Sequence, residues 1–148
     1  MLAAVALLTG EQFVRSMGNS FDSVRDTLAH LHGADEVWLQ RWNGESPAGL
    51  PPATRFADFE SLRAAWTELG RRLQQFVGGL DSERLERSVS YRAFNGQNAT
   101  IPLWQLLQHV VNHGSYHRGQ VTTLLRQLEV APPAGMDLVA FYRERSAR

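Results

Sequence analysis

Residues 103–128, LWQLLQHVVNHGSYHRGQVTTLLRQL, form the longest helical pattern in the chain. Apolar side chains recur there every three or four residues, a spacing that puts them on one face of an α-helix. The spacing predicts one continuous helix from Leu103 to Leu128. Pro102 suits its first turn, and Pro132 and Pro133 follow its end. The apolar face comprises Leu106, Val110, Val121, Leu124 and Leu128.

Three histidines recur at every fourth position of this helix: His109, His113 and His117. At roughly 100° per residue, His113 and His117 fall inside the apolar face, and His109 lies towards its edge. Two inward imidazoles one turn apart have the spacing of metal ligands, although core histidines that bond to neighbours fit the pattern equally well. The motif is not that of a zinc protease, because Val110 stands where H-E-x-x-H has its glutamate.

The composition limits the classes of function. The length of 148 residues suits a single domain, which we expect over residues 1–148. The 15 basic and 15 acidic residues cancel, so we expect no nucleic-acid partner. The apolar start, MLAAVALL, is too short to span a bilayer and does not resemble a signal peptide, so we expect no membrane partner. Cysteine is absent, which excludes thiolate ligands and fits a cytoplasmic protein.

Three other long or partial helices are expected before residue 80. Met1–Leu8 reads as the end of a core helix. A second helix begins with Ser20 as its N-cap and runs to about Trp42, and a third, Phe59–Val77, is capped by Asp58. Apolar residues at helical spacing give both of these helices an inward face.

The remaining segments read as connections, apart from one short helix near the end. Residues 43–57 hold three prolines and two glycines, which predicts a long loop. Asp81–Leu85 suits a single helical turn, and the Asn95–Gly96 pair within residues 88–101 predicts a small hairpin. A last helix, Leu138–Arg145, is expected to pack Leu138 and Phe141 inward. The pattern predicts an all-α fold: a four-helix bundle with a short hairpin-like insertion before the last long helix.

The second helix carries the other two histidines, His30 and His32, on opposite flanks of its apolar face. A helix in a bundle touches two neighbours, so helical geometry alone leaves both as candidate third ligands. On the third helix, Arg71 and Arg72 are typical of a solvated face.

Two segments together resemble the DinB family of damage-inducible bacterial proteins. They are TLAHLHGADEVWLQRW, residues 27–42, and PLWQLLQHVVNHGSYHRGQV, residues 102–121. The resemblance extends over nearly the whole chain, and NHxxYHRGQ is its most specific part. Members of the family usually begin with a longer first helix than the eight residues expected here.

The resemblance implies an up-down-down-up four-helix bundle, usually a homodimer, that holds a divalent metal on three histidines. Carried over by motif, these ligands are His30, His113 and His117, while His32 and His109 do not coordinate the metal. Three imidazoles and no thiolate suit zinc or nickel. An apolar flank on the last long helix, formed by Trp104, Leu107 and Val111, also favours a homodimer.

Other side chains are candidates for supporting roles at this centre. Asp35 and Glu36 lie just over one turn beyond His30, and either could orient a ligand imidazole. Tyr116 could donate a hydrogen bond near the metal or simply pack. Asn112 and Gln120 could polarise a substrate.

The resemblance also implies a class of chemistry. Relatives in the wider superfamily are metal-dependent transferases and isomerases that use low-molecular-weight thiols such as bacillithiol or mycothiol. We therefore expect a metal-dependent thiol S-transferase acting on small electrophilic molecules. A metal-dependent hydrolase and a metal-stabilised stress-response binding protein without turnover are the alternatives, and an open coordination position would favour an enzyme.

Overall fold

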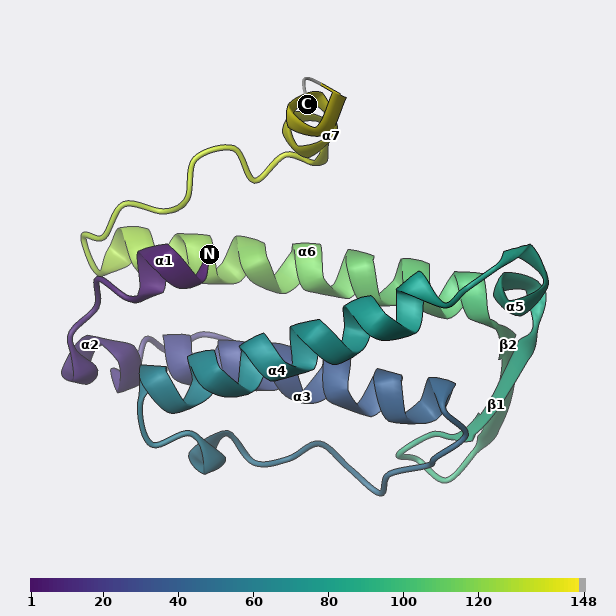
Figure 1. Cartoon of the computed structure of the whole chain (residues 1–148). Coiled ribbons are helices and arrows are strands. Elements are labelled where there is room, and N and C mark those ends of the chain that lie inside the picture. Colours follow the sequence, from purple (N-terminus) through teal and green to yellow (C-terminus); the bar gives the residue numbers. More distant parts are fainter. Residues whose placement is uncertain (147–148) are drawn as a thin grey trace.

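The computed structural model describes residues 1–146 and is mostly helical, with one two-stranded sheet. Three long helices lie along one another: α3 (Val24–Trp42), α4 (Phe59–Gly78) and α6 (Leu103–Gln127) (Figure 1). The shorter helices are α1 (Leu2–Val5), α2 (Gly10–Val14), η1 (Ala53–Arg55), α5 (Ser82–Glu86) and α7 (Leu138–Ser146).

The long connection between α3 and α4 sets the directions of the helices. Residues 43–58 return along the length of the molecule, so α3 and α4 run the same way and α6 runs opposite to them (Figure 1). These directions match the last three helices of an up-down-down-up bundle. The four-helix count itself is not confirmed, because α1 is a single turn within the described residues.

Local sequence explains where the long helices begin. The Asp58 carboxylate accepts a hydrogen bond from the Ser61 backbone N–H at 2.8 Å, which caps α4 as expected. The N-cap of α3 is Ser23, three residues later than predicted; its hydroxyl oxygen accepts a bond from the Asp26 N–H at 3.1 Å. The predicted continuity of α6 is confirmed, and no break occurs at Gly114.

Gly114 has a packing role inside α6. The guanidinium of Arg118 lies over it, and a Cβ atom at this position would stand 2.8 Å from Arg118 Nη1. The cost of a glycine within a helix is about 1 kcal/mol relative to alanine, and here the glycine makes room for the Arg118 side chain.

The predicted hairpin is confirmed as an antiparallel pair, β1 (Ser88–Arg92) and β2 (Asn98–Pro102). Its turn contains Gly96 at φ +84°, a conformation that favours glycine. Val89, opposite Ile101, is buried against the ends of the long helices. The backbone N–H of Leu103 donates to the Arg87 carbonyl at 3.0 Å, so the hairpin leads directly into α6.

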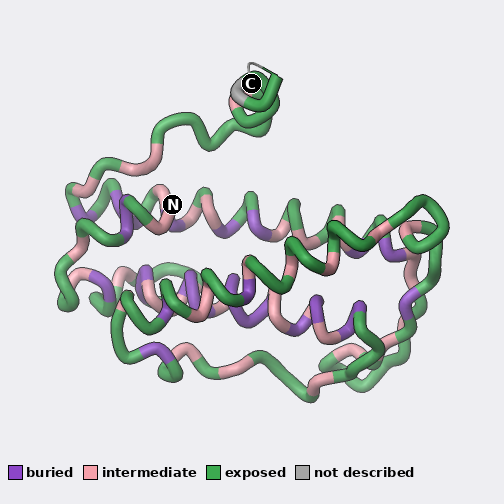
Figure 2. Tube along the Cα trace, in the orientation of Figure 1, coloured by how far each residue is buried: buried purple, intermediate pink, exposed green. Residues whose placement is uncertain are grey.

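The core forms where α3, α4 and α6 face one another, and their outer faces are exposed (Figure 2). It has two parts. One lies at the α1–α2 end and includes Val24, Leu28, Leu62, Val121 and Leu125; the other lies at the hairpin end and includes Leu39, Trp42, Leu69, Val89 and Leu106.

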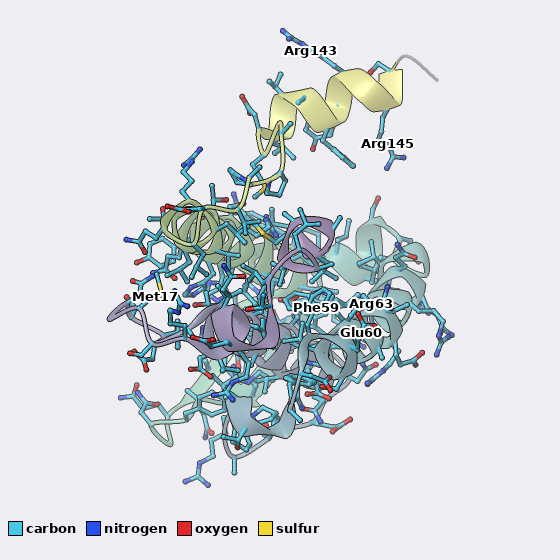
Figure 3. The ribbon with its side chains drawn as sticks, turned by 90° about the vertical axis from the view of Figure 1, so that its left-hand side faces the viewer. Met17, Phe59, Glu60, Arg63, Arg143 and Arg145 are labelled. Atoms are coloured by element: carbon cyan, nitrogen blue, oxygen red, sulfur yellow. The ribbon has the colours of Figure 1, made fainter. Side chains whose placement is uncertain are left out.

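The two ends of the chain differ from the sequence prediction. The short first helix expected over Met1–Leu8 is present but shorter, since α1 ends at Val5. A second short helix, α2, was not predicted; Thr9 caps it in a capping box with Gln12. The expected inward packing of α7 is wrong, because Leu138 and Phe141 are 56% and 48% exposed. Figure 3 shows α7 standing apart from the other helices, with Arg143 and Arg145 pointing into solvent.

Over residues 1–146, none of the helices combines the length and the apolar character that crossing a membrane requires.

Candidate metal centre

Two helices bring three histidines together near the middle of the molecule. Helix α3 supplies His30, and α6 supplies His113 and His117 from successive turns of one face. One ring nitrogen of each lies within 4.8 Å of the other two. The structure therefore selects His30, rather than His32, as the α3 histidine that faces the pair on α6.

The Nε2 atoms of His30 and His117 both lie close to Nε2 of His113, at 3.1 and 3.0 Å. Ligand atoms on a tetrahedral zinc with bonds of 2.0–2.1 Å are separated by about 3.3 Å. These two separations are close to that value, and all three ligand atoms lie within 4.8 Å of one another, so a metal ion would fit after small side-chain movements.

Burial and repulsion from neighbouring imidazoles favour the neutral forms of His113 and His30. Desolvation, followed by repulsion from His117, His30 and His109, lowers the pKa of His113 to about 4. Desolvation and, to a smaller degree, repulsion from His117 also lower the pKa of His30. A neutral imidazole has a lone pair available for a metal at pH 7, whereas an imidazolium has none.

Gln120 determines which nitrogen of His117 faces the other two rings. His117 Nδ1 donates a hydrogen bond to Gln120 Oε1 at 2.7 Å, so its Nε2 carries the lone pair. The Nε2–H of His113 can then donate to Nε2 of His117 or to Nε2 of His30, but not to both. The lone pair on the remaining Nε2 atom has no donor, and a bound cation would satisfy all three nitrogens at once.

Aromatic side chains enclose part of this cluster. The Phe21 ring stacks on His30, with centroids 4.1 Å apart, and contacts His117 by its edge at 5.4 Å. Tyr116 contacts His117 edge-on at 5.0 Å but is mostly exposed. No sequence pattern marked Phe21, because it precedes α3 and reaches His30 only through the path of the loop.

The cluster keeps an accessible side. His117 is buried, whereas His30 and His113 are partly exposed. Among residues 1–146, no fourth histidine or carboxylate joins the three. Three protein ligands and an exposed side leave space for water or a substrate, the arrangement typical of catalytic rather than structural zinc sites.

The other two histidines lie outside the cluster. His32 is buried between Phe56 and Trp66, and its Nδ1 contacts Arg55. His109 is exposed on α6, with its ring 5.2 Å from Trp38 and 5.9 Å from His113. Neither contributes an atom to the converging nitrogens.

Neither carboxylate proposed as a supporting group contacts a histidine of the cluster by a hydrogen bond or ion pair among the described residues. Glu36 pairs with Arg55 at 2.8 Å, on the His32 side of α3. Asp35 lines a recess with Leu31, Trp66 and Val110, between the long helices. The structure places Gln120, rather than either carboxylate, against an imidazole of the cluster, that of His117, and Asn112 is exposed.

Comparisons with known proteins agree on one family. The sequence model that describes the DinB family matches residues 1–145 of this chain. Protein DinB of Bacillus subtilis is 26% identical, over 81% of this chain and 73% of its own length. The crystal structure of a DinB-like protein from Bacillus cereus superposes with a TM-score of 0.68 at 17% identity, covering 90% of this chain and 87% of that one. At such low identity, the structural match supports the fold alone.

Proposed function

Because the chain belongs to the DinB family, we propose that it is a metal-dependent thiol S-transferase of the cytoplasm that acts on small electrophilic molecules. It would hold one divalent metal, zinc or nickel, on His30, His113 and His117. The observation that carries the proposal is the convergence of three Nε2 atoms from two helices, with one side open to solvent.

The donor set suits these metals. Neutral imidazoles without thiolates are ligands that zinc and nickel accept well. A divalent ion with an open position lowers the pKa of a coordinated thiol or water, so that it is deprotonated at neutral pH. A chain without cysteine would rely on an external thiol to supply the sulfur nucleophile.

The chain's own residues have separate parts in this proposal. Gln120 holds the His117 ring with Nε2 towards the site and Nδ1–H away from it. Phe21 covers one side of the His30 ring and excludes water there. The exposed Tyr116 and His109 stand at the rim, where a thiol or an electrophile would approach.

Metal titration tests the site directly. Stripped protein should take up one equivalent of Zn²⁺ or Ni²⁺ at pH 7.5. Alanine at His30, His113 or His117 should weaken binding by at least the 10–100-fold that outer-shell changes typically cost. His109→Ala is the matched control, since it removes a neighbouring imidazole from the same helix. Unchanged affinity in His30→Ala, or loss of binding in His109→Ala, would contradict the assignment.

Turnover is a separate measurement. Metal-loaded protein should accelerate the reaction of a thiol with a chlorinated nitrobenzene, in which the sulfur forms a bond to the ring and chloride leaves. Bacillithiol, mycothiol and glutathione should be compared as thiols. Activity towards an ester without any added thiol would favour a hydrolase instead. Metal binding with neither reaction would favour a metal-stabilised binding protein.

A further inference from the structure

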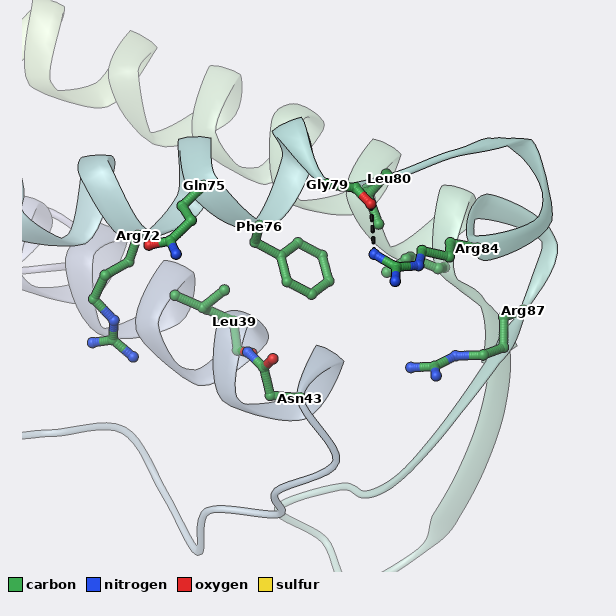
Figure 4. Close-up of a pocket in the computed structure, with 10 residues that line it drawn as sticks. Leu39, Asn43, Arg72, Gln75, Phe76, Gly79, Leu80, Arg84 and Arg87 are labelled. Carbon is green, nitrogen blue, oxygen red and sulfur yellow. Dashed lines mark hydrogen bonds between the residues drawn. The ribbon is translucent and has the colours of Figure 1, made fainter.

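A second recess lies at the hairpin end of the molecule, away from the histidines. It has a volume of about 490 Å³ and is bounded by the C-terminal ends of α3 and α4, by α5 and by the start of α6 (Figure 4). Leu39 on its wall follows His30 by nine residues, and Leu103 precedes His113 by ten. At 1.5 Å per helical residue, the two sites are about 13–15 Å apart along the helices.

Three arginines line this recess, Arg84 and Arg87 at one end and Arg72 at the other (Figure 4). Arg72 reaches it from α4, and Arg84 and Arg87 reach it from the segment that follows α4 (Figure 4). No aspartate or glutamate lines it. The chain as a whole is electrically neutral, with 15 basic and 15 acidic residues, so this is a local excess of positive charge.

The arginines keep most of their donors free. In the part of the chain that the structure describes, the five ion pairs involve other arginines: Arg15, Arg25, Arg55, Arg63 and Arg71. Arg84 Nη1 donates to the Gly79 carbonyl at 2.6 Å, which satisfies the end of α4 and uses one of its five N–H groups. The other guanidinium donors of Arg84 remain available to a ligand.

Acidic residues also lie near the recess, although none lines it. One carboxylate oxygen of Asp81 accepts the backbone N–H of Arg84 at 2.8 Å, and α5 holds two further glutamates, Glu83 and Glu86. Glu68 lies one turn before Arg72, pairs with Arg71 and also attracts Arg72. The positive charge is therefore concentrated on the wall of the recess, with acidic side chains outside it.

Apolar side chains form the rest of the wall. Leu39 and Leu103 are buried, and Phe76 is partly exposed beside them. A volume near 490 Å³ falls within the 300–1,000 Å³ that is usual for small-molecule sites. A ligand that fits such a wall carries an apolar part as well as negative charge.

We propose that this recess binds a small organic phosphate monoester. Arg84 and Arg87 hold the phosphate oxygens, Arg72 contributes to the positive field, and the organic part lies against Phe76 and Leu39. A phosphate dianion offers three acceptor oxygens to guanidinium groups, which bind phosphate through paired N–H donors. The site is independent of the metal centre and of the thiol chemistry proposed for it.

Calorimetric titration of the full-length, metal-stripped chain with phenyl phosphate tests the proposal. At pH 7.5 the probe is a dianion, and binding is expected in low salt, weakening as salt screens the arginines. Arg84→Gln and Arg87→Gln should each weaken binding by about tenfold, the typical effect of a charge-assisted hydrogen bond. Arg71→Gln is the matched control, since it makes the same change beside Arg72 on α4, and it should stay within about twofold.

Further variants and ligands distinguish binding in this recess from a general attraction between arginines and anions. Arg87→Gln does not remove the bond that Arg84 makes to Gly79, so it tests the site even if Arg84→Gln destabilises the fold. Phenol should not bind, and inorganic phosphate should bind less tightly than phenyl phosphate. His113→Ala should leave the affinity unchanged. Undetectable binding at 10 mM, equal affinity in the Arg84 and Arg87 variants, or loss of binding in His113→Ala would overturn the proposal.

Discussion

Gln120 is the residue that orients the proposed metal ligand His117. Its Oε1 accepts the Nδ1–H of His117 at 2.7 Å, which directs Nε2 towards His113. Groups that orient ligand imidazoles are typically worth 10–100-fold in metal affinity. Gln120→Ala should therefore weaken zinc binding by about 10–100-fold while leaving one equivalent bound at saturation.

Competition against a coloured chelator would measure this change. Gln127→Ala is the control, because Gln127 is an exposed glutamine of the same helix. Equal affinities in the two variants would mean that Gln120 does not orient His117.

Asp35 is a second residue whose surroundings predict a measurable effect, a dependence of the protein's stability on pH. Desolvation raises its pKa from 3.8 to about 6, against the opposing effect of Arg118. The folded protein therefore binds more protons than the unfolded chain between pH 3.8 and 6, and the contribution of Asp35 to stability falls as pH rises through this window. Above pH 6 the folded state carries the cost of a charged carboxylate that is only partly exposed to solvent.

Asp35→Asn should accordingly stabilise the protein at pH 8 and change little at pH 3.5. A shift of about two units sets an upper bound of roughly 3 kcal/mol, and we expect about 1–2 kcal/mol. Urea denaturation at both pH values would measure it. Glu45→Gln, at an exposed position, is the control and should show no such pH-dependent gain. Destabilisation of Asp35→Asn at pH 8 would show that the carboxylate has a favourable partner.

One buried cation, Arg41, lies between α3 and the hairpin. Arg41 is 5% exposed, and its guanidinium carbon lies 4.7, 4.6 and 4.7 Å from the ring centroids of Trp38, Tyr91 and Phe94. Its Nε has no hydrogen-bond partner among the described residues. Burial removes solvent from the charge and so lowers the pKa of Arg41. Cation–π attraction and desolvation therefore act in opposite directions.

The balance between cation–π attraction and desolvation predicts different losses of stability for two substitutions of Arg41. Desolvated cation–π contacts are worth about 2 kcal/mol, and an unsatisfied buried donor costs about 1–3 kcal/mol. Arg41→Met keeps the volume and removes the unsatisfied donor, so it should stay within about 1 kcal/mol of the native protein. Arg41→Ala leaves a cavity and should cost about 2–3 kcal/mol.

Chemical denaturation would measure the stability of both variants, with Arg126→Ala, an exposed position on α6, as the control. If Arg41→Met is as unstable as Arg41→Ala, the cation itself, rather than the packing, joins the hairpin to α3.

At the scale of the whole molecule, the surface of α6 leads to a prediction of the oligomeric state. The outer flank of α6 exposes Trp104 at 41% and Val111 at 57%, with Leu107 partly buried between them. Neighbouring exposed apolar residues on one helix face favour an interface. We propose that two copies of the chain pair through this flank.

Light scattering should give the mass of a dimer at micromolar concentration for the native chain. Val111→Glu should give a monomer, because the charge would be buried without a partner at the interface. Thr123→Glu, at an exposed position about a third of a turn around α6 from Val111, should remain dimeric. A monomeric native chain would contradict the pairing, and a monomeric Thr123→Glu variant would place the interface elsewhere on α6.

Much of this structure follows from interactions within a few residues. Asp58 and Ser61 cap α4 because a side chain and a backbone N–H three residues apart meet at a helix start. His113 and His117 share a face of α6 because residues four apart do so in any α-helix. The continuous α6 and the Gly96 turn are local in the same way, so the sequence alone predicts them.

Other features depend on how the elements meet. His30 and His32 lie two residues, or about 200°, apart on one helix. The position of α6 makes the first a neighbour of His113, while Trp66 and Phe56 enclose the second. Helical spacing left both open, and only the family resemblance favoured His30. His30 could be assigned to the cluster only from the structure, which shows how α3 is rotated about its axis.

The same dependence explains what the sequence predicted wrongly or missed. Glu36 has the spacing of a supporting group for His30, but its nearest cation is Arg55 from a separate segment. Phe21 and the pocket arginines Arg84 and Arg87 carry no motif, because loops and chain crossings bring them to their sites. Periodicity and capping are encoded over three or four residues and can be read directly. A contact between distant segments is decided by the packing of the helices, because their relative rotation and axial position determine which side chains meet.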